Sequence, residues 1–394
     1  MAGRVLVLNT GSSSIKYELV DAATGDRPAR GLVERVGEAR GRLTHHAGDD
    51  PPYVRERPFR DHREGLEAAL EAFEAAGPEL SPVAVGHRVV HGGDRFTGAV
   101  LIDEGVIRAI EELAPLAPLH NPVNLTGIRI ARAAFPGVPQ AAVFDTAFQL
   151  TLPPQAYTYA VPRDWRERLG VRRFGFHGTS CAYVCRRAAA LLGRDLATLD
   201  LIVLHLGNGA SATAISGGRS VDTSMGMSPL EGLVMGTRSG DVDPALAGYL
   251  ARVEGMDAER VEDALSRRSG LLALTGTGDM REVRVRGDKE ALLALEIYTR
   301  RIRKYVGAFY ALLGRLDAIV FTGGVGEHDA ATRAESLAGL GRLGIVVDPG
   351  LNRARADGER AVSPQDAEVA VLVIPTDEEW EIARQTLALV GGDG

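Results

Sequence analysis

The stretch VLVLNTGSSSIKYELV, residues 5–20, predicts a strand, a polar turn and a returning strand. Residues 5–8 form an apolar run typical of a buried strand, and residues 15–20 alternate like a half-buried one. A second stretch, LIVLHLGNGASATAI at residues 201–215, repeats this order, and the Gly217-Gly218 pair after it predicts a two-residue hairpin. The repeat predicts a duplicated α/β domain with two phosphate-gripping hairpins that face one cleft.

The rest of the chain supplies further helices and strands for both domains. Helical spacing and end signals predict helices at 63–76, 104–113, 124–134, 288–313, from about 330, and at 377–389. Short apolar runs predict strands at 83–90, 141–145, 318–321 and 369–374. Residues 151–162 carry three prolines without a helical period, so we place the crossing between domains there. The closing helix is too short for a domain and is expected to pack back on an earlier one.

Composition excludes several classes of protein. With 45% hydrophobic and 25% charged residues, the 394-residue chain can bury a large core, and its net charge of −7 gives no case for binding nucleic acid or an anionic membrane. No apolar stretch reaches the roughly 18 residues of a membrane span. Cys181 and Cys185 cannot form a disulfide framework and are expected as small buried residues on one helix face. We therefore expect a cytoplasmic protein.

Lysine usage and glycine spacing narrow the kind of nucleotide site. Lys16, Lys289 and Lys304 are the only lysines, and none follows a glycine, so the GxxxxGK[ST] loop is absent. The segment from Gly207 to Ala212 copies the spacing of a dinucleotide fingerprint. That fingerprint requires a helix next, whereas an alternating strand follows here, so a Rossmann site is rejected.

Three other segments are candidates for contact with a nucleotide. Residues 9–16 combine a glycine, three serines and the rare Lys16, which suits phosphate oxygens, although an ordinary hairpin turn is the alternative. Residues 323–327 place three glycines between a strand and a helix, where the backbone can approach a flat adenine or ribose. Residues 279–281 can clamp a nucleotide edge or form a solvated surface pair.

Five side chains have both a functional and an ordinary interpretation. Arg88 and Arg238 each fit a phosphate clamp or a structural ion pair, and two such loops in one chain favour the clamp. His177 fits a catalytic group, a helix cap or a core histidine. Asp145 fits a site carboxylate or a helix cap, and Glu378 lies at a helix start, where the dipole favours an acidic residue anyway.

Taken together and in this order, the motifs resemble those of the acetate kinase family of acetate and propionate kinases. The matching stretches span essentially the whole chain: NTGSSSIK, GHRVVHGG, APLHNP, VFDTAF, RFGFHGTS, HLGNGASA, DTSMGMSPLEGLVMGTRSGD and FTGGVGE. The resemblance implies an α/β fold with two duplicated ribonuclease-H-like domains around a nucleotide cleft, as in the actin, sugar-kinase and heat-shock-chaperone ATPase superfamily. Residues 1–150 with 380–394 would form the acetate-side lobe, and residues 151–379 the nucleotide-side lobe.

The activity implied by the resemblance is reversible transfer of the ATP γ-phosphoryl to acetate by direct in-line transfer, giving acetyl phosphate and ADP. Mg²⁺ would be the metal, with Mn²⁺ as an alternative, and Asn9 and Glu378 would hold it. The implied catalytic residues are Arg88 for the carboxylate, His177 and Arg238 for the transferring phosphoryl, and Asp145 as the proton donor or acceptor near the metal.

The resemblance implies a longer set of residues for the co-substrate. Those implied in binding ATP or ADP are Ser12, Lys16, His205, Leu206, Gly207, Asn208, Gly209, Asp279, Met280, Arg281, Gly324, Val325, Gly326, Glu327 and His328. Two positions depart from the family pattern. His328 stands where the family usually carries Asn, which affects adenine-side contacts, and Cys181 replaces a His common after the HGTS motif.

Physical chemistry refines two of these roles. Acetate is already ionised at pH 7, so no general base is essential, and Asp145 suits a metal-orienting role better than that of a base. The apolar residues implied beside the substrate are Val90, Leu119, Phe176 and Pro229. A branched Val90 leaves more room for a methyl than for an ethyl group, and a methylene in a tight pocket is worth roughly 1–3 kcal/mol, so acetate is expected over propionate.

Two rival classes share the implied fold. A sugar or glycerol kinase needs polar residues to read hydroxyls, whereas the Arg88 region is apolar with one cation. An actin-like or chaperone ATPase would use the nucleotide to drive assembly or client binding, but 394 residues leave no room for a client domain beside two lobes. A homodimer is expected from the family alone.

Overall fold

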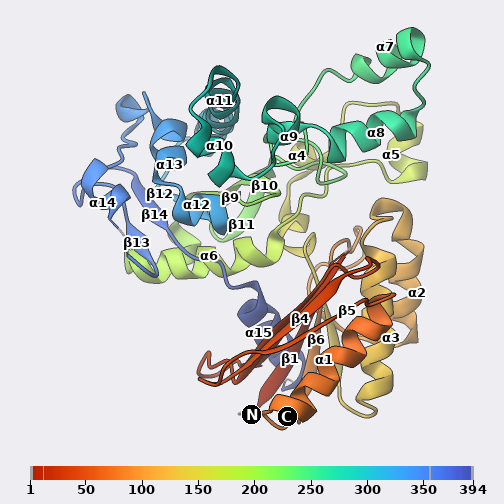
Figure 1. The fold of residues 1–394 in the computed structure, drawn as a ribbon. Coiled ribbons are helices and arrows are strands. Elements are labelled where there is room, and N and C mark those ends of the chain that lie inside the picture. The colour runs from red at the N-terminus through yellow and green to blue at the C-terminus, as the bar shows by residue number, and fades with distance from the viewer. Residues whose placement is uncertain (1–2, 12, 355, 392–394) are drawn as a thin grey trace. The chain divides into compact units, whose positions relative to one another are not determined.

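The computed structural model describes residues 3–11, 13–354 and 356–391, and contacts divide the chain into two compact units (Figure 1). Unit 1 is Met1–Phe148 with Asp377–Gly394, and unit 2 is Gln149–Thr376. The segment predicted as the crossing, residues 151–162, begins just after the first change of unit. Ser12, one of the residues implied in ATP binding, lies outside the described residues.

Unit 1 is built on one sheet with the strand order β5-β4-β3-β2-β1-β6-β8-β7. Its strands are β1 (Arg4–Thr10), β2 (Ser14–Asp21), β3 (Ala29–Glu34), β4 (Gly41–Ala47), β5 (Tyr53–Arg57), β6 (Ala84–Val89), β7 (Val100–Leu101) and β8 (Gln140–Phe144). Its helices are α1 (His62–Ala76), α2 (Glu104–Glu112), η1 (Ala114–Leu116), α3 (Asn121–Ala134) and α15 (Glu378–Val390), with η2 (Ala147–Thr151) at the change of unit.

The apolar run at residues 5–8 lies in strand β1, and its burial explains why apolar and polar residues do not alternate there. Successive side chains of a strand point to opposite faces, and both faces of this sheet are covered. Leu6 and Leu8 enter the core beneath α1 and α3, while Val5 and Val7 enter the core beneath α15. Each buried side chain of this size contributes roughly 1.5–3 kcal/mol relative to exposure. The prediction that the closing helix packs back on an earlier domain is confirmed, and Figure 1 shows α15 beside the N-terminal strands.

Unit 2 is built on a second sheet with the order β11-β10-β9-β12-β14-β13. Its strands are β9 (Asp200–Leu206), β10 (Ala210–Ser216), β11 (Arg219–Thr223), β12 (Ala318–Thr322), β13 (Arg360–Ala361) and β14 (Ala370–Val373). Gly217 and Gly218, both with positive φ, form the hairpin between β10 and β11, as predicted. Its helices are α4 (Pro154–Tyr157), α5 (Arg163–Leu169), α6 (Gly178–Leu192), η3 (Leu196–Thr198), α7 (Ala245–Glu254), α8 (Ala258–Arg267), α9 (Gly270–Thr275), α10 (Met280–Arg286), α11 (Lys289–Leu313), α12 (Gly323–His328), α13 (Ala330–Leu337), η4 (Gly341–Leu343) and α14 (Pro349–Arg353).

The two sheets repeat one topology. In unit 1, β1 pairs antiparallel with β2 and parallel with β6, which pairs parallel with β8. In unit 2, β9 pairs antiparallel with β10 and parallel with β12, which pairs parallel with β14. The predicted duplication is confirmed. Because parallel strands end at the same edge of a sheet, the residues after β1, β6 and β8 gather at one edge, and those after β9, β12 and β14 at another.

The observed elements differ from the predicted ones in several places. The antiparallel strands β3 to β5 were not predicted, because their short segments mix charged and apolar residues. The glycine segment 323–327 is not a plain turn but lies in the short helix α12, and α3 begins earlier than predicted, with proline in its first turn. Leu292 fits the apolar spacing of the long helix but is 53% exposed, because the buried stripe of α11 runs through Ala291 and Leu295 and leaves Leu292 to one side.

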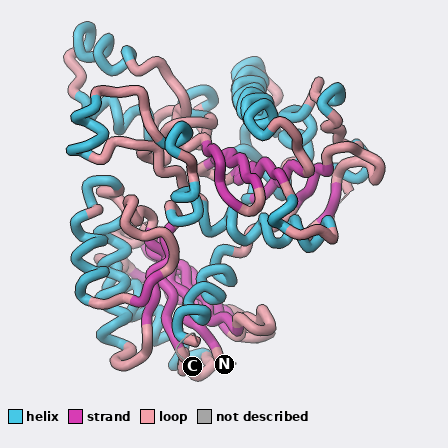
Figure 2. Tube along the Cα trace, turned by 180° about the vertical axis from the view of Figure 1, so that it is seen from behind, coloured by secondary structure: helices cyan, strands magenta, loops and turns pink. Residues whose placement is uncertain are grey.

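Two further sequence-based expectations can be compared with the structure. Cys181 and Cys185 are free and buried on α6, as expected. Among the described residues, no helix is both long and apolar enough to cross a membrane. Figure 2 shows the helices that flank the strands of each unit.

Candidate active site

In unit 1, the ends of β1, β6 and β8 bring Asn9, Arg88 and Asp145 together. Nε of Arg88 donates to both carboxylate oxygens of Asp145 at 3.1 and 3.0 Å, and Nη2 donates to Oδ2 at 2.6 Å. Nη1 of Arg88 donates to Oδ1 of Asn9 at 3.1 Å. The Asp145 side chain is 2% exposed and that of Arg88 is 23% exposed. Asp145 and Asn9 therefore hold the Arg88 guanidinium by hydrogen bonds, and part of the Arg88 side chain remains exposed to solvent.

Arg88 forms an ion pair, which was one of the two interpretations predicted for it. It also keeps the capacity to bind an anion, as the other interpretation, a phosphate clamp, requires. Burial opposes its charged form, but attraction from Asp145 and Glu378 outweighs burial and raises the pKa of Arg88. A guanidinium has five N–H donors. The contacts seen among the described residues leave hydrogens on Nη1 and Nη2 that a small anion can accept.

Glu378, at the start of α15, adds a second carboxylate to this part of unit 1. Its half-buried side chain has a pKa raised to about 7, first by loss of water and then by Asp145 and Glu379, against the opposing pull of Arg88 and Lys16. The site thus concentrates more negative charge than Arg88 neutralises. A bound cation would relieve that excess.

Lys16 lies in a different environment from the one that the motif suggested. Its Nζ is 2.8 Å from Oε1 of Glu379 and 3.3 Å from Oε1 of Glu18. Burial opposes the charged form, but the two carboxylates raise the pKa of Lys16. Lys16 therefore fixes the first turn of α15 in this structure, and its side chain remains 44% exposed.

In unit 2, two histidines form a stacked pair at the end of β9. The rings of His177 and His205 have centroids 4.1 Å apart and planes inclined by 24°. Nδ1 of His177 lies 2.9 Å from Oγ of Ser211, and Nδ1 of His205 lies 2.8 Å from Oγ of Ser180. Each ring is therefore held through one nitrogen by a serine hydroxyl.

The backbone of His177 is unusual. It precedes α6 with φ 55° and ψ 28°, a left-handed conformation that costs a non-glycine residue of order 1 kcal/mol or more. Its side chain makes no capping hydrogen bond to the helix. His177 therefore occupies the N-cap position of α6, as one interpretation had it, but its side chain does not cap the helix and its ring stacks on His205 instead.

Arg238 lies close to His177. A Cβ added to Gly209 would be 3.3 Å from Nη1 of Arg238 and 3.6 Å from Nε2 of His177, so only glycine leaves this space open. Nη1 of Arg238 donates to the carbonyl of Pro229 at 3.2 Å, and no described carboxylate pairs with it. Burial lowers the pKa of Arg238. A partly buried guanidinium without an acidic partner is poised for an anionic ligand.

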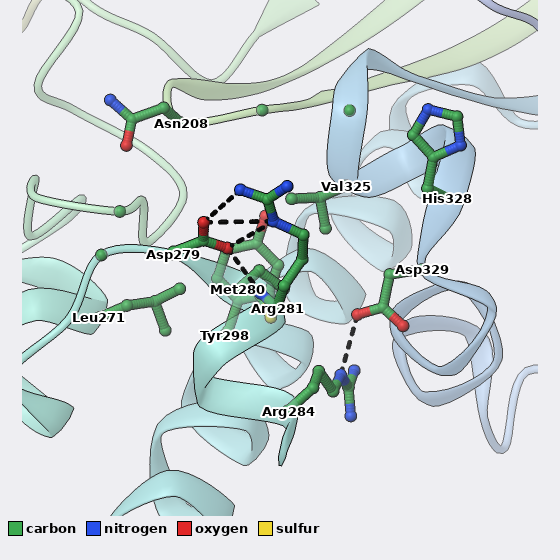
Figure 3. A pocket seen from close by; sticks show the side chains of 14 residues that line it. Asn208, Leu271, Asp279, Met280, Arg281, Arg284, Tyr298, Val325, His328 and Asp329 are labelled. Atoms are coloured by element: carbon green, nitrogen blue, oxygen red, sulfur yellow. Dashed lines mark hydrogen bonds and ion pairs between the residues drawn. The ribbon is translucent and has the colours of Figure 1, made fainter. Parts of the chain in front are cut away.

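A cavity of about 580 Å³ opens within unit 2 beside these groups. Its lining joins the turn after β9, the starts of α10 and α12, and one side of α11 (Figure 3). The predicted residues in its lining are Gly207, Asn208, Asp279, Met280, Arg281, Gly324, Val325 and His328. This volume suits a drug-sized ligand or nucleoside, and its walls are mostly apolar with a few polar groups.

The Asp279–Arg281 pair borders this cavity as predicted, but the two side chains bind each other. Nε and Nη2 of Arg281 donate to the Asp279 carboxylate (Figure 3). The hydrogen bond from Arg281 lowers the pKa of Asp279 to about 2. Arg281 is 90% exposed, so its guanidinium can leave the pair and cover a ligand.

Helix α12 is fixed from both ends. Oε1 of Glu327 accepts the N–H of Gly323 at 2.9 Å and that of Thr376 at 3.2 Å. Gly323 has φ 76°, and a Cβ there would collide with the backbone of Leu206. At the other end, the fully buried Arg333 donates from Nη1 to the carbonyls of Gly326 and Glu327, both at 2.9 Å.

The residues implied beside the substrate fall into both units. Val90, in unit 1, is buried, and its N–H donates to Oδ1 of Asn124 at 3.2 Å, whereas Leu119 is 49% exposed. In unit 2, Phe176 is buried and Pro229 is half-buried. Within unit 1, Val90 follows Arg88 by two residues, which suits a wall beside the guanidinium.

Sequence reasoning missed the residues that hold the site in place. Asn124 also donates from Nδ2 to the carbonyl of Thr10 at 2.8 Å, so it ties the ends of β1 and β6 together. Arg284 and Tyr298 line the cavity and were not singled out. Asn124 lies just after the APLHNP stretch, and Ser180 is the last residue of the HGTS stretch. The sequence alone does not show that either side chain supports a neighbouring group.

Two α/β units of one topology, one with an arginine–carboxylate edge and the other with a nucleoside-sized cavity, define a phosphotransferase of the actin-like ATPase fold. The model of the acetokinase family matches residues 4–384, and the chain belongs to that family. It is therefore an enzyme of acetate metabolism, with ATP and ADP as co-substrates.

Curated relatives agree over nearly the whole chain. An acetate kinase of Streptomyces coelicolor is 56% identical, covering 99% of this chain and 98% of the relative, and one of Clavibacter michiganensis is 55% identical, covering 98% and 99%. Among solved structures, an acetate kinase of Porphyromonas gingivalis has a TM-score of 0.93 at 43% identity, covering 99% of this chain and all of the other. A propionate kinase from Francisella tularensis has the same TM-score at 38% identity and the same coverage.

Proposed function

We propose that the protein transfers the γ-phosphoryl group of ATP to acetate in one direct, in-line step and catalyses the reverse reaction as well. The observation that carries this proposal is the Arg88 guanidinium, held by Asp145 and Asn9, with spare N–H donors beside the buried Val90. A guanidinium that keeps spare N–H donors next to a small apolar wall suits a short carboxylate. A sugar would need several polar groups to pair its hydroxyls.

Each charged residue has a role in this scheme. Phosphoryl transfer needs alignment and neutralisation of charge on the equatorial oxygens rather than covalent help. Arg88 binds and orients the acetate carboxylate. Arg238 and His177 stabilise the transferring group, which is supported by the absence of a carboxylate partner for Arg238 among the described residues. Asp145 orients Arg88 and takes no proton from the ionised substrate.

The donor atoms near Arg88 fit Mg²⁺, and Mn²⁺ is an alternative with similar preferences. Asn9 offers an amide oxygen and Glu378 a carboxylate, and hard divalent cations prefer oxygen ligands. Burial above all, and then the neighbouring Asp145 and Glu379, raise the pKa of Glu378, and a bound cation would favour its ionised form. When bound, the ion would neutralise phosphate charge, while Asn9 and Glu378 would hold it in place.

ATP is proposed to bind in unit 2, with its base and ribose in the 580 Å³ cavity. Residues 205–209 and 324–328 would contact the nucleotide, and Asp279 to Arg281 would border it. Ser12 and Lys16 of unit 1 remain candidates for phosphate contact. For Lys16 this requires release from Glu379, because the ion pair occupies its ammonium here.

We also propose that the protein is a cytoplasmic homodimer. Helix α7 has no buried residue, and Tyr249 and Val253 are each 56% exposed on it (Figure 1). An isolated helix of this length is marginal in water, so a second copy that covers its apolar side would stabilise it. The free, buried cysteines suit a reducing compartment.

A hydroxamate assay tests the function. Purified protein with ATP, Mg²⁺ and a series of short acids should form acyl hydroxamate in the presence of hydroxylamine, fastest with acetate. ADP release that does not depend on acetate would contradict the proposal and favour an ATPase that drives assembly. Phosphorylation of glycerol or a hexose instead would favour the sugar-kinase class.

A further inference from the structure

A chain of hydrogen bonds in unit 2 joins the glycine-rich helix α12 to the histidine pair, and Thr376 lies at its centre. The backbone N–H of Thr376 donates to Oε1 of Glu327 at 3.2 Å. Its hydroxyl lies 2.8 Å from Oγ of Ser180, which in turn lies 2.8 Å from Nδ1 of His205. Thr376 is also the last residue of unit 2 before the chain returns to unit 1.

Both ends of this chain are parts of the proposed site. At one end, the Glu327 oxygen that accepts from Thr376 also accepts the N–H of Gly323, so one carboxylate fixes Thr376 relative to α12. At the other end, His205 stacks on His177, whose own Nδ1 is held by Ser211. The orientation of the histidine pair is thereby linked to the helix that borders the cavity.

The hydroxyls impose a direction on these bonds. The Ser180 hydroxyl has one proton, so it can donate to only one of Thr376 and His205 and must accept the hydrogen bond with the other. Ser180 is fully buried, where water does not replace a lost partner. Without the Thr376 hydroxyl, the Ser180 hydroxyl loses the contact that fixes its rotation, and His205 loses a fixed partner.

We propose that Thr376 is a positioning residue for phosphoryl transfer. Its hydroxyl acts through Ser180 to fix the ring of His205, and His205 in turn orients the stacked ring of His177. The Glu327 carboxylate on α12 holds the backbone of Thr376 in place. This inference rests on the proposed roles of His177 and of the nucleotide cavity. It adds a side chain that need touch neither substrate.

The test is Thr376→Val, which removes the hydroxyl but keeps the shape and the backbone bond to Glu327. Loss of one such hydrogen bond predicts a kcat for acetyl phosphate formation lowered about tenfold, with the KM for acetate unchanged. Thr376→Ser restores the hydroxyl and should keep kcat within about twofold of wild type. A wild-type kcat in Thr376→Val, or no recovery in Thr376→Ser, would overturn the inference.

Thr386→Val is the matched control. The hydroxyl of Thr386 is buried in α15 and has no hydrogen-bond partner among the described residues, so the same chemical change there should leave kcat unaltered. Thermal unfolding of each variant separates a loss of fold from a loss of positioning. A kcat loss in Thr386→Val equal to that in Thr376→Val would show a general effect of the substitution and refute the role.

A double-mutant cycle with Ser180→Ala tests the route. Because Thr376 is inferred to act through Ser180, the double variant should be no slower than Ser180→Ala alone, whereas independent effects would multiply. Multiplied losses would refute the route. His177→Ala distinguishes a failure of the proposed site from a failure of this inference. A wild-type kcat in His177→Ala refutes the proposed site. A low kcat in His177→Ala together with a wild-type kcat in Thr376→Val refutes only the role of Thr376.

Discussion

Arg238 and Arg88 have different surroundings, and this decides which variant is the cleaner probe. Removing Arg88 breaks the ion pair of the buried Asp145 carboxylate, so Arg88→Ala should lose stability as well as activity. Arg238 leaves no described carboxylate unpaired. A kcat loss in Arg238→Ala therefore reports on the reaction itself.

We predict that Arg238→Ala lowers kcat about 10²- to 10³-fold, the usual effect of removing one preorganised donor from a developing charge. Its thermal midpoint should stay close to that of wild type. Steady-state kinetics and thermal unfolding measure the two effects, with the exposed Arg353→Ala as a control that should change neither. Turnover near wild type in Arg238→Ala would contradict its role.

Val90→Ala tests the size of the acid pocket. Enlarging this wall should raise kcat/KM for propionate relative to acetate by about tenfold, since one methylene in a tight pocket is worth roughly 1–3 kcal/mol. The ratio of kcat/KM for the two acids, measured in wild type and variant, checks this. An unchanged ratio would show that Val90 does not set the size limit.

At the scale of elements, strand β6 carries a histidine with a consequence for acid stability. Burial lowers the pKa of His87 to about 4, against about 6.5 for an unfolded chain. Between these values the unfolded state binds a proton that the native state does not, so stability is fully present above pH 6.5 and falls as pH drops toward 4. Between pH 7 and pH 5 this group alone should remove about 2 kcal/mol.

The measurement is denaturant unfolding at the two pH values, followed through Trp380 in unit 1 on a Trp165→Phe background. His87→Gln keeps a neutral donor near Gln140, the partner of the His87 ring at 2.8 Å. The variant should lose about 2 kcal/mol less than the parent between pH 7 and pH 5. An equal loss in both proteins would show that His87 already titrates normally.

Helix α12 depends on Arg333, which is the largest fully buried side chain among the described residues. Arg333→Met fills the space but leaves the carbonyls of Gly326 and Glu327 without donors, so stability should fall by roughly 3 kcal/mol. Because α12 borders the cavity, the KM for ATP should rise while that for acetate stays unchanged. Arg353→Met, an exposed change on the nearby α14, should alter neither, and equal changes in both KM values in Arg333→Met would contradict a local effect.

The elements also show what a sequence can and cannot reveal. The apolar runs of β1 and β9 were predictable because a strand that is buried on both faces is apolar along its length. Helix α11 was predictable because a helix that is buried on one side repeats apolar residues every three or four positions. Strands β3 to β5 do alternate in burial, but Gly31, Gly41 and His45 occupy buried positions of β3 and β4, so the hydropathy of the sequence does not show this alternation. The candidate residues were found through glycine turns and motifs, but the ion pair of Lys16 with Glu379 joins positions far apart in the chain. No local pattern encodes such a contact.

At the scale of the whole molecule, the exposed helix α7 predicts self-association. Tyr249→Glu with Val253→Glu would place charge on the proposed interface, so the variant should be a monomer under conditions in which wild type is a dimer. Sedimentation equilibrium measures the mass. Val54→Glu, at an apolar position of unit 1 that is 41% exposed, is the control and should leave the mass unchanged. A variant that remains dimeric would place the interface elsewhere.

Helix α15 belongs to unit 1 although unit 2, roughly 230 residues, lies between it and β8 in the chain. During synthesis, the face of β1 that carries Val5 and Val7 therefore stays uncovered for on the order of ten seconds or more, until α15 leaves the ribosome. Unit 2 has all its strands in one continuous stretch and can fold first. A released chain that ends at residue 376 should thus hold a folded second unit and a first unit with an open, chaperone-binding surface at Val5, Val7 and Val143.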